Sequence, residues 1–146
     1  MSTGLAVFDT TVQETNEWLR DIESRLPPCT RQHAYSALRA TLHLLRDHLP
    51  MDAVLGLSAQ LPMLLRGVLF EGWRPATKAA RTRDPEALMA ELKAHLPAAF
   101  PREPDMILEA VAAVLSSKVN HDEARKLVQH IPVPLRVFWP RYLSAP

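Results

Sequence analysis

The chain has 146 residues and a formal net charge of +1 at pH 7, with 47% hydrophobic and 23% charged residues. This composition is typical of a globular protein that buries about 70% of its unfolded surface. The small net charge gives no support to nucleic-acid or membrane-surface binding, and no hydrophobic run reaches the roughly 18 residues of a membrane span.

The positions of the prolines predict where the helices begin. Leu and Ala dominate and glycine is scarce, which favours helix over strand, and Pro is favoured at the first helical position. In chain order, we predict helices over about residues 10–26, 31–49, 51–60, 62–70, 84–96, 104–119, 120–131 and from 132 onward.

The strongest local signals are N-caps and one amphipathic face. Thr11-x-x-Glu14 and Asn120-x-x-Glu123 match the capping-box pattern, and Asp84 precedes a helix-opening proline. The clearest apolar face lies in the second segment and consists of Tyr35, Leu38, Leu42, Leu45 and Leu49. The sequence therefore predicts an all-α fold.

An internal repeat with a period of 70 residues predicts the architecture. Leu26-Pro27 aligns with Leu96-Pro97, and residues 61–66 align with residues 131–136. We expect one all-helical domain over residues 1–146, a bundle of about eight short helices from two tandem four-helix repeats (5–75 and 75–145). The shared residues are mainly Leu, Ala and Pro, so the repeat concerns the framework more than an active site.

Two arginines are the repeated polar residues without a capping explanation. Arg66 and Arg136 occupy equivalent places, one turn after a helix-opening proline. They could hold a carboxylate or phosphate between the halves. Alternatively they pair with Asp52 and Asp122, or bond carbonyl groups at helix ends.

Aromatic residues lie near the ends of both halves. Trp73 follows Phe70, and Trp139 follows Phe138. Such residues usually seal a core, whereas an exposed pair would mark an interaction surface. Arg66, Arg136, Trp73 and Trp139 are therefore the candidate ligand or interaction residues.

Other titratable groups give weak signals for a site. His43 and Asp47 are spaced for one helix face, but a metal site needs further ligands, and we expect them to pair on the surface. Asp122 lies at the predicted start of a helix, where an acidic side chain stabilises the free N–H groups, so no further function is needed to explain it. We predict no metal, no cofactor and no catalytic residue, and we interpret the single Cys29 as an incidental thiol.

The expected location is the cytoplasm. A single cysteine excludes an intrachain disulfide, and the first residues, MSTG, show no feature of a secretory signal.

Two stretches resemble a known bacterial family. Residues 35–50 (YSALRATLHLLRDHLP) and 57–75 (LSAQLPMLLRGVLFEGWRP) are similar to the core of the family named domain of unknown function 2267. The turn at Gln60-Leu61-Pro62 and the end at Glu71-Gly72-Trp73 carry the resemblance best. It implies a small, cytoplasmic, all-helical protein and assigns no activity.

Three hypotheses for function remain. We expect a non-catalytic interaction module with a protein partner or a second copy of itself. The alternative is a small-ligand, anion-binding or enzymatic site in the groove between the repeats, where Arg66, Arg136, His43 and Asp47 are the residues to test. The third is nucleic-acid or anion contact through the basic linker residues Arg74, Lys78, Arg81 and Arg83, for which a solvated linker is the simpler interpretation. No membrane partner is expected.

Overall fold

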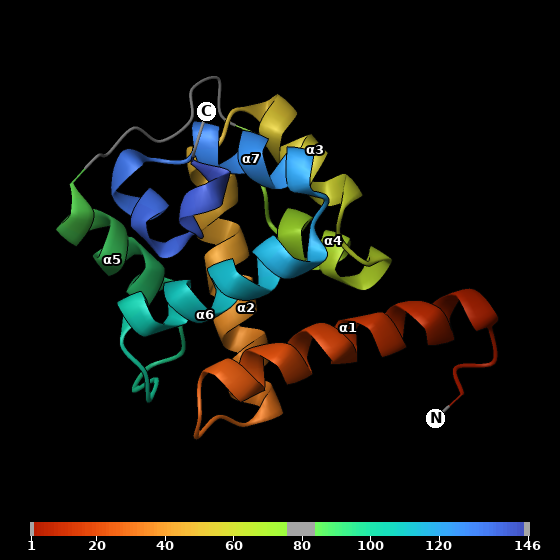
Figure 1. The fold of residues 1–146 in the computed structure, drawn as a ribbon. Coiled ribbons are helices and arrows are strands. Elements are labelled where there is room, and N and C mark those ends of the chain that lie inside the picture. The colour runs from red at the N-terminus through yellow and green to blue at the C-terminus, as the bar shows by residue number, and fades with distance from the viewer. Residues whose placement is uncertain (1, 76–83, 145–146) are drawn as a thin grey trace.

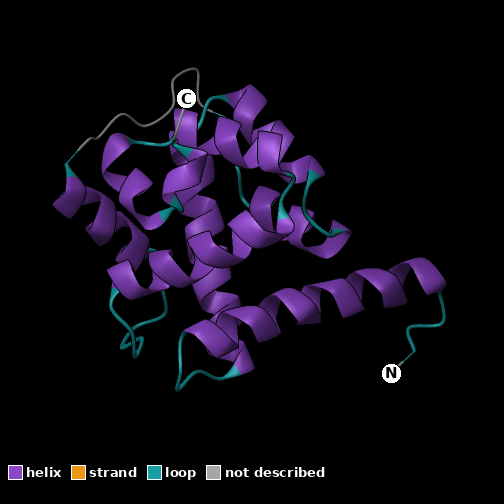
Figure 2. Ribbon diagram, in the orientation of Figure 1, coloured by secondary structure: helices purple, strands orange, loops and turns teal. Residues whose placement is uncertain are grey.

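The structure is a computed structural model that describes residues 2–75 and 84–144. Over these two ranges the chain forms helices and no strand, which confirms the predicted all-α class (Figure 2). The α-helices are α1 (Ala6–Arg25), α2 (Arg31–His48), α3 (Met51–Ala59), α4 (Met63–Phe70), α5 (Pro85–Ala94), α6 (Pro104–Lys118) and α7 (His121–His130). Two 3-10 helices follow, η1 (Val133–Phe138) and η2 (Arg141–Leu143).

Helix α2 lies in the middle of the molecule and contacts α1, α4, α5 and α6 (Figure 1). Twelve of its 18 residues are buried. Its predicted apolar face is buried at Leu38, Leu42, Leu45 and Leu49, whereas Tyr35 is half-buried. Because α4 and α5 cover the other side of α2, several polar side chains are buried as well.

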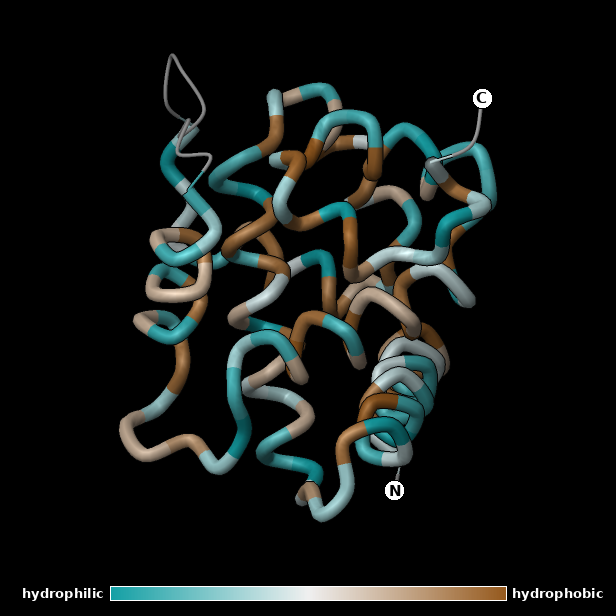
Figure 3. The backbone as a smooth tube through the Cα atoms, turned by 60° about the vertical axis from the view of Figure 1, so that its left-hand side comes forward, coloured by the Kyte–Doolittle hydropathy of each residue, from teal (hydrophilic) through white to brown (hydrophobic). Residues whose placement is uncertain are grey.

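Side chains from α1 to η2 form one hydrophobic core around α2. In Figure 3 the hydrophobic stretches of the backbone gather in the middle, and many peripheral loops are hydrophilic. Among the largest fully buried side chains are Ile22, Leu65, Leu69, Leu88, Leu92 and Leu108. No helix in residues 2–75 or 84–144 combines the length and hydrophobicity of a membrane span.

Helix α1 begins four residues earlier than predicted, and its expected capping box is absent. Its N-cap is Leu5, whose side chain makes no capping hydrogen bond. The Thr3 N–H donates to Asp9 Oδ1 at 2.6 Å, so an acidic side chain in the first turn binds the segment before the helix. Thr11 lies inside the helix and accepts a hydrogen bond from the Leu64 N–H (2.8 Å). Thr11 thereby caps α4 instead of α1.

Other helix ends follow the sequence signals more closely. Asp84 Oδ1 accepts the Glu86 N–H at 3.2 Å, as its predicted capping role requires. Asn120 also caps, through Asp122 N–H (2.9 Å), but the Asn120 N–H donates to Gln60 Oε1, so the predicted box does not close.

The segment after Pro132 was predicted as an α-helix and is a 3-10 helix over Val133–Phe138. Pro134 lies in the first turn, where its missing N–H costs no intrahelical bond, and Pro140 follows soon after the helix ends. Pro140 limits the length of this segment, and short helices are often of the 3-10 type.

Candidate functional site

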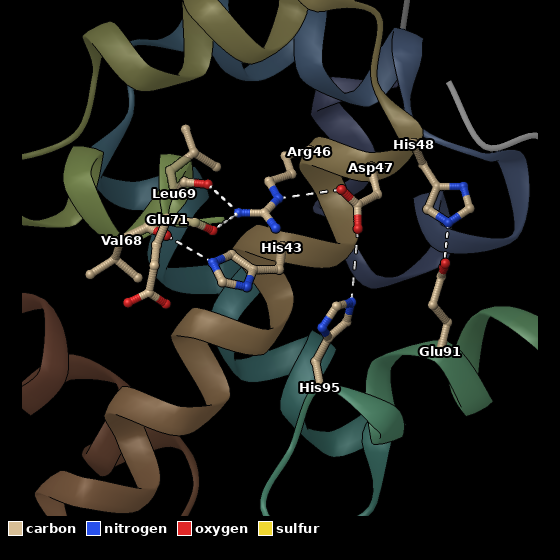
Figure 4. A network of polar contacts seen from close by, with 9 residues as sticks. All are labelled: His43, Arg46, Asp47, His48, Val68, Leu69, Glu71, Glu91 and His95. Atoms are coloured by element: carbon tan, nitrogen blue, oxygen red, sulfur yellow. Dashed lines mark hydrogen bonds and ion pairs between the residues drawn. The ribbon is translucent and has the colours of Figure 1, made fainter. Parts of the chain in front are cut away.

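A row of polar side chains on α2 links this helix to α4 and α5 (Figure 4). His43 and Arg46 point to the end of α4, and Asp47 and His48 point to α5. His43, Arg46 and His48 are buried. Buried polar groups require partners. Each of the three side chains has at least one, although Nδ1 of His48 has none among the described residues.

Arg46 binds the carbonyl groups that the end of α4 leaves free. Its Nη1 donates to the Leu69 carbonyl (2.7 Å) and the Glu71 carbonyl (2.6 Å). Its Nε lies 3.3 Å from Asp47 Oδ1. The final carbonyl groups of a helix have no intrahelical partner, and a guanidinium with five donors suits them.

His43 binds the same helix end as a neutral imidazole. Its Nε2 lies 2.8 Å from the Val68 carbonyl, so Nε2 carries the hydrogen and donates it. Burial lowers the pKa of His43 below its usual 6.5, and the nearby charges of Arg46 and Arg39 act in the same direction. The predicted surface pair of His43 with Asp47 is wrong, because α4 covers His43 and offers it a carbonyl group.

Two histidine–carboxylate contacts join α2 to α5. His95, which follows the last residue of α5, lies 3.9 Å from Asp47 Oδ2 through its Nε2. His48 contacts Glu91 through Nε2. The His43 and His95 rings meet edge to face with centroids 5.9 Å apart.

A surface hollow of about 380 Å³ lies beside this row, between α2 and the end of α5. Its lining consists of Tyr35, Ser36, Arg39, His95, Leu96 and Pro97. Arg39 donates from Nε (3.0 Å) and Nη2 (2.7 Å) to Glu71 Oε1. These hydrogen bonds from Arg39 hold the pKa of Glu71 below its usual 4.5.

The predicted candidates Arg66 and Arg136 lie outside the hollow. Arg66 donates to the carbonyl groups of Ser58 (3.0 Å) and Leu61 (3.3 Å), at the end of α3. Arg136 donates to the Gln129 carbonyl (2.9 Å) near the end of α7. Both arginines thus bind carbonyl groups at helix ends, and neither makes an ion pair with Asp52 or Asp122 in the described ranges.

The two tryptophan candidates differ in accessibility. Trp139 is 4% exposed and belongs to the core. Trp73 is half-buried and stacks on Phe70, with ring centroids 5.4 Å apart. Of the predicted basic linker residues, Lys78, Arg81 and Arg83 lie outside the described residues.

No group of three or more His, Cys, Asp or Glu side chains suited to a metal ion occurs in residues 2–75 and 84–144. The row on α2 is therefore a set of hydrogen bonds and ion pairs between helices. Sequence reasoning missed Arg39, Arg46 and His95. Arg39, His43 and Arg46 recur at spacings of four and three, a helical signal for a second, polar face of α2. No local pattern identifies His95.

Sequence reasoning also missed an exposed group of apolar side chains at the start of α1 and α4. The N-terminal end of α1 extends beyond the other helices (Figure 1). We call this surface the α1–α4 apolar surface. It consists of Leu5, Val7, Phe8, Val12, Met63 and Leu64, each between 40% and 51% exposed.

Phe8 continues the buried face of α1 past the edge of the core. Phe8 precedes the buried Thr15 by two helical turns and the buried Ile22 by four, so all three share one face. The hydrogen bond from Leu64 to Thr11 places the start of α4 against the same part of α1. The start of α4 therefore lies close to the part of α1 where Phe8 and Val12 are exposed.

Comparison with known proteins identifies the family. Residues 15–138 match the sequence profile described as "Uncharacterized conserved protein (DUF2267)". The chain belongs to the DUF2267 family. The predicted resemblance is thereby confirmed, and the DUF2267 match includes both stretches that carried it. A comparison with curated proteins finds no match. The DUF2267 match starts at Thr15, after the part of α1 that carries Phe8 and Val12.

Proposed function

We propose that this protein is a non-catalytic helical interaction module that associates with a second copy of itself through the α1–α4 apolar surface. The observation that carries the proposal is the group of large apolar side chains at the start of α1 and α4 that is left about half exposed. Burying such side chains is the main favourable term in protein association.

A second copy fits this surface for geometrical reasons. A two-fold interface uses the same area on both subunits, and the protruding end of α1 can lie against α1 and α4 of its partner. The net charge of +1 also causes little repulsion between copies.

The size of the surface suits a weak dimer. Six half-exposed side chains present on the order of 500 Å² per copy, which equals the largest patch of many monomers. A standard interface buries about 800 Å² per partner, so flanking polar residues must contribute. We therefore expect weak, reversible association.

We also infer that the repeat supplies framework and not a site. Arg66 and Arg136 bind carbonyl groups at the ends of corresponding helices, α3 and α7. This shared task supports a tandem duplication, with residues 5–75 and 75–145 as its two parts and 1–146 as one domain. It gives no support to a ligand held by both arginines.

Sedimentation velocity between about 5 and 500 μM tests self-association. We expect a rise from monomer to dimer in the native protein, and a monomer at every concentration for Val12→Glu, because a buried unpaired charge opposes association. Val137→Glu is the matched control, since Val137 is 79% exposed on η1, which packs on α6.

Circular dichroism establishes that both variants keep the native helix content. A native protein that stays monomeric at the highest concentration would contradict the proposal. So would an equal effect of both substitutions.

A further inference from the structure

The hollow between α2 and the end of α5 has the composition of a ligand site. One wall is a single face of α2 with Tyr35, Ser36 and Arg39, and the other is the segment His95 to Pro97. At about 380 Å³ it lies at the small end of the volume range of ligand pockets.

The polar groups of these walls favour an anion. Arg39 and His95 can carry positive charge, and no carboxylate is among the lining residues. In the described part of the chain, the Tyr35 and Ser36 hydroxyl groups form no hydrogen bond, so both can donate to a ligand. Arg39 uses Nε and Nη2 for Glu71, which leaves Nη1 available.

The two carboxylates near the hollow, Glu71 and Asp47, do not prevent an anion from binding to Arg39 and His95. Glu71 is the partner of Arg39, and its side chain is 56% exposed. Exposed ion pairs contribute little free energy, so Glu71 can release Arg39 at small cost. Asp47 lies 3.9 Å from His95, a distance beyond a direct hydrogen bond.

The buried side chains of Arg46 and His43 lie next to the hollow. Arg46 is held by two carbonyl groups, and its positive charge stays in place whether or not a ligand is bound. Burial lowers the pKa of His43, which favours its neutral form. Both Arg39 and His95 are close enough to His43 to influence its pKa, so these two lining side chains lie in one region.

We propose that this hollow binds a small organic anion with one carboxylate or phosphate group. Arg39 and His95 hold the anionic group, the hydroxyl groups of Tyr35 and Ser36 donate to it, and Leu96 and Pro97 contact the apolar part. The guanidinium of Arg39 suits either head group, because its donors match planar carboxylate and phosphate oxygens. This site is separate from the α1–α4 apolar surface and does not require self-association.

Titration with phenyl phosphate and with benzoate tests the site. The NMR signals of the His95 imidazole report binding, at pH 7 and constant ionic strength. We expect a saturable shift of the His95 signals with at least one ligand. The ligand that binds identifies the head group. Inorganic phosphate should bind about threefold more weakly than phenyl phosphate, since it makes no contact with the apolar wall.

Three variants separate binding from folding. Arg39→Gln and Tyr35→Phe should weaken binding, by about tenfold and about threefold, with unchanged unfolding free energies. Arg66→Gln is the matched control, because Arg66 is an exposed arginine outside the hollow, and it should bind like the native protein.

Three results would overturn the inference. They are shifts that never saturate with either ligand, equal binding by Arg39→Gln and the native protein, and binding of inorganic phosphate as tight as that of phenyl phosphate.

Discussion

Arg46, Arg66 and Arg136 perform the same physical task at three helix ends. Each donates from its guanidinium to carbonyl groups at or just beyond the last turn of a helix, α4, α3 and α7 respectively. Arg46 is buried, whereas Arg66 is exposed. If Arg46 is removed, water cannot easily take its place as the donor to the two carbonyl groups.

Replacing Arg46 should therefore be costly. We expect Arg46→Ala to lower the free energy of unfolding by about 2–3 kcal/mol, since two charge-assisted hydrogen bonds are lost inside the protein. Urea unfolding measures the change. Arg66→Ala removes the same kind of contact at an exposed site and should cost about 1 kcal/mol or less. An equal loss of unfolding free energy in the two variants would show that the burial of Arg46 does not strengthen its contribution to stability.

His43 should make stability depend on pH. Because burial lowers its pKa below 6.5, the folded protein keeps it neutral while the unfolded chain takes up a proton near 6.5. Its contribution is complete above that value and is lost as the pH falls from 6.5 toward the pKa of the folded state.

Urea unfolding between pH 8 and pH 5 measures this contribution. His43→Gln keeps a donor for the Val68 carbonyl and does not titrate, so its stability should fall less over this range. The same fall in the variant and the native protein would rule out His43 as the cause.

At the scale of elements, α2 determines both the core and the candidate site. Periodicity predicted its apolar face correctly, and Leu38, Leu42 and Leu45 are fully buried. The predicted surface pair of His43 with Asp47 was wrong, and Arg46 was not identified, because the packing of α4 and α5 on α2 depends on the whole fold and not on local spacing.

Helix starts show the same division between local and tertiary causes. The cap by Asp84 is local, and sequence predicted it. The hydroxyl of Thr11 looked like a cap for its own helix, yet it caps α4 across an interface. Residues 53 positions apart make this bond, and no local pattern reveals it.

Thr11→Val tests that cap, since valine has the same shape without the hydroxyl. We expect a loss of about 1 kcal/mol in the free energy of unfolding, the usual value for an N-cap. Thr10→Val is the control at the neighbouring exposed position and should change stability by less than about 0.5 kcal/mol. If Thr11→Val is as stable as the control, the hydrogen bond from Leu64 to Thr11 does not stabilise the protein.

At the scale of the molecule, the protein is a DUF2267 core with an exposed helical extension. The family match covers residues 15–138, and the α1 part of the α1–α4 apolar surface precedes it. The extension carries the half-exposed side chains of Leu5, Val7, Phe8 and Val12, on which the proposal of self-association rests. Self-association is accordingly proposed for this chain and not for the family.

Hydrogen–deuterium exchange of the amides of residues 5–14, at about 5 and 500 μM protein, tests this central proposal most directly. Self-association predicts slower exchange of these amides at the higher concentration in the native protein and no such change in Val12→Glu. Exchange of residues 5–14 that is independent of concentration in the native protein would contradict it.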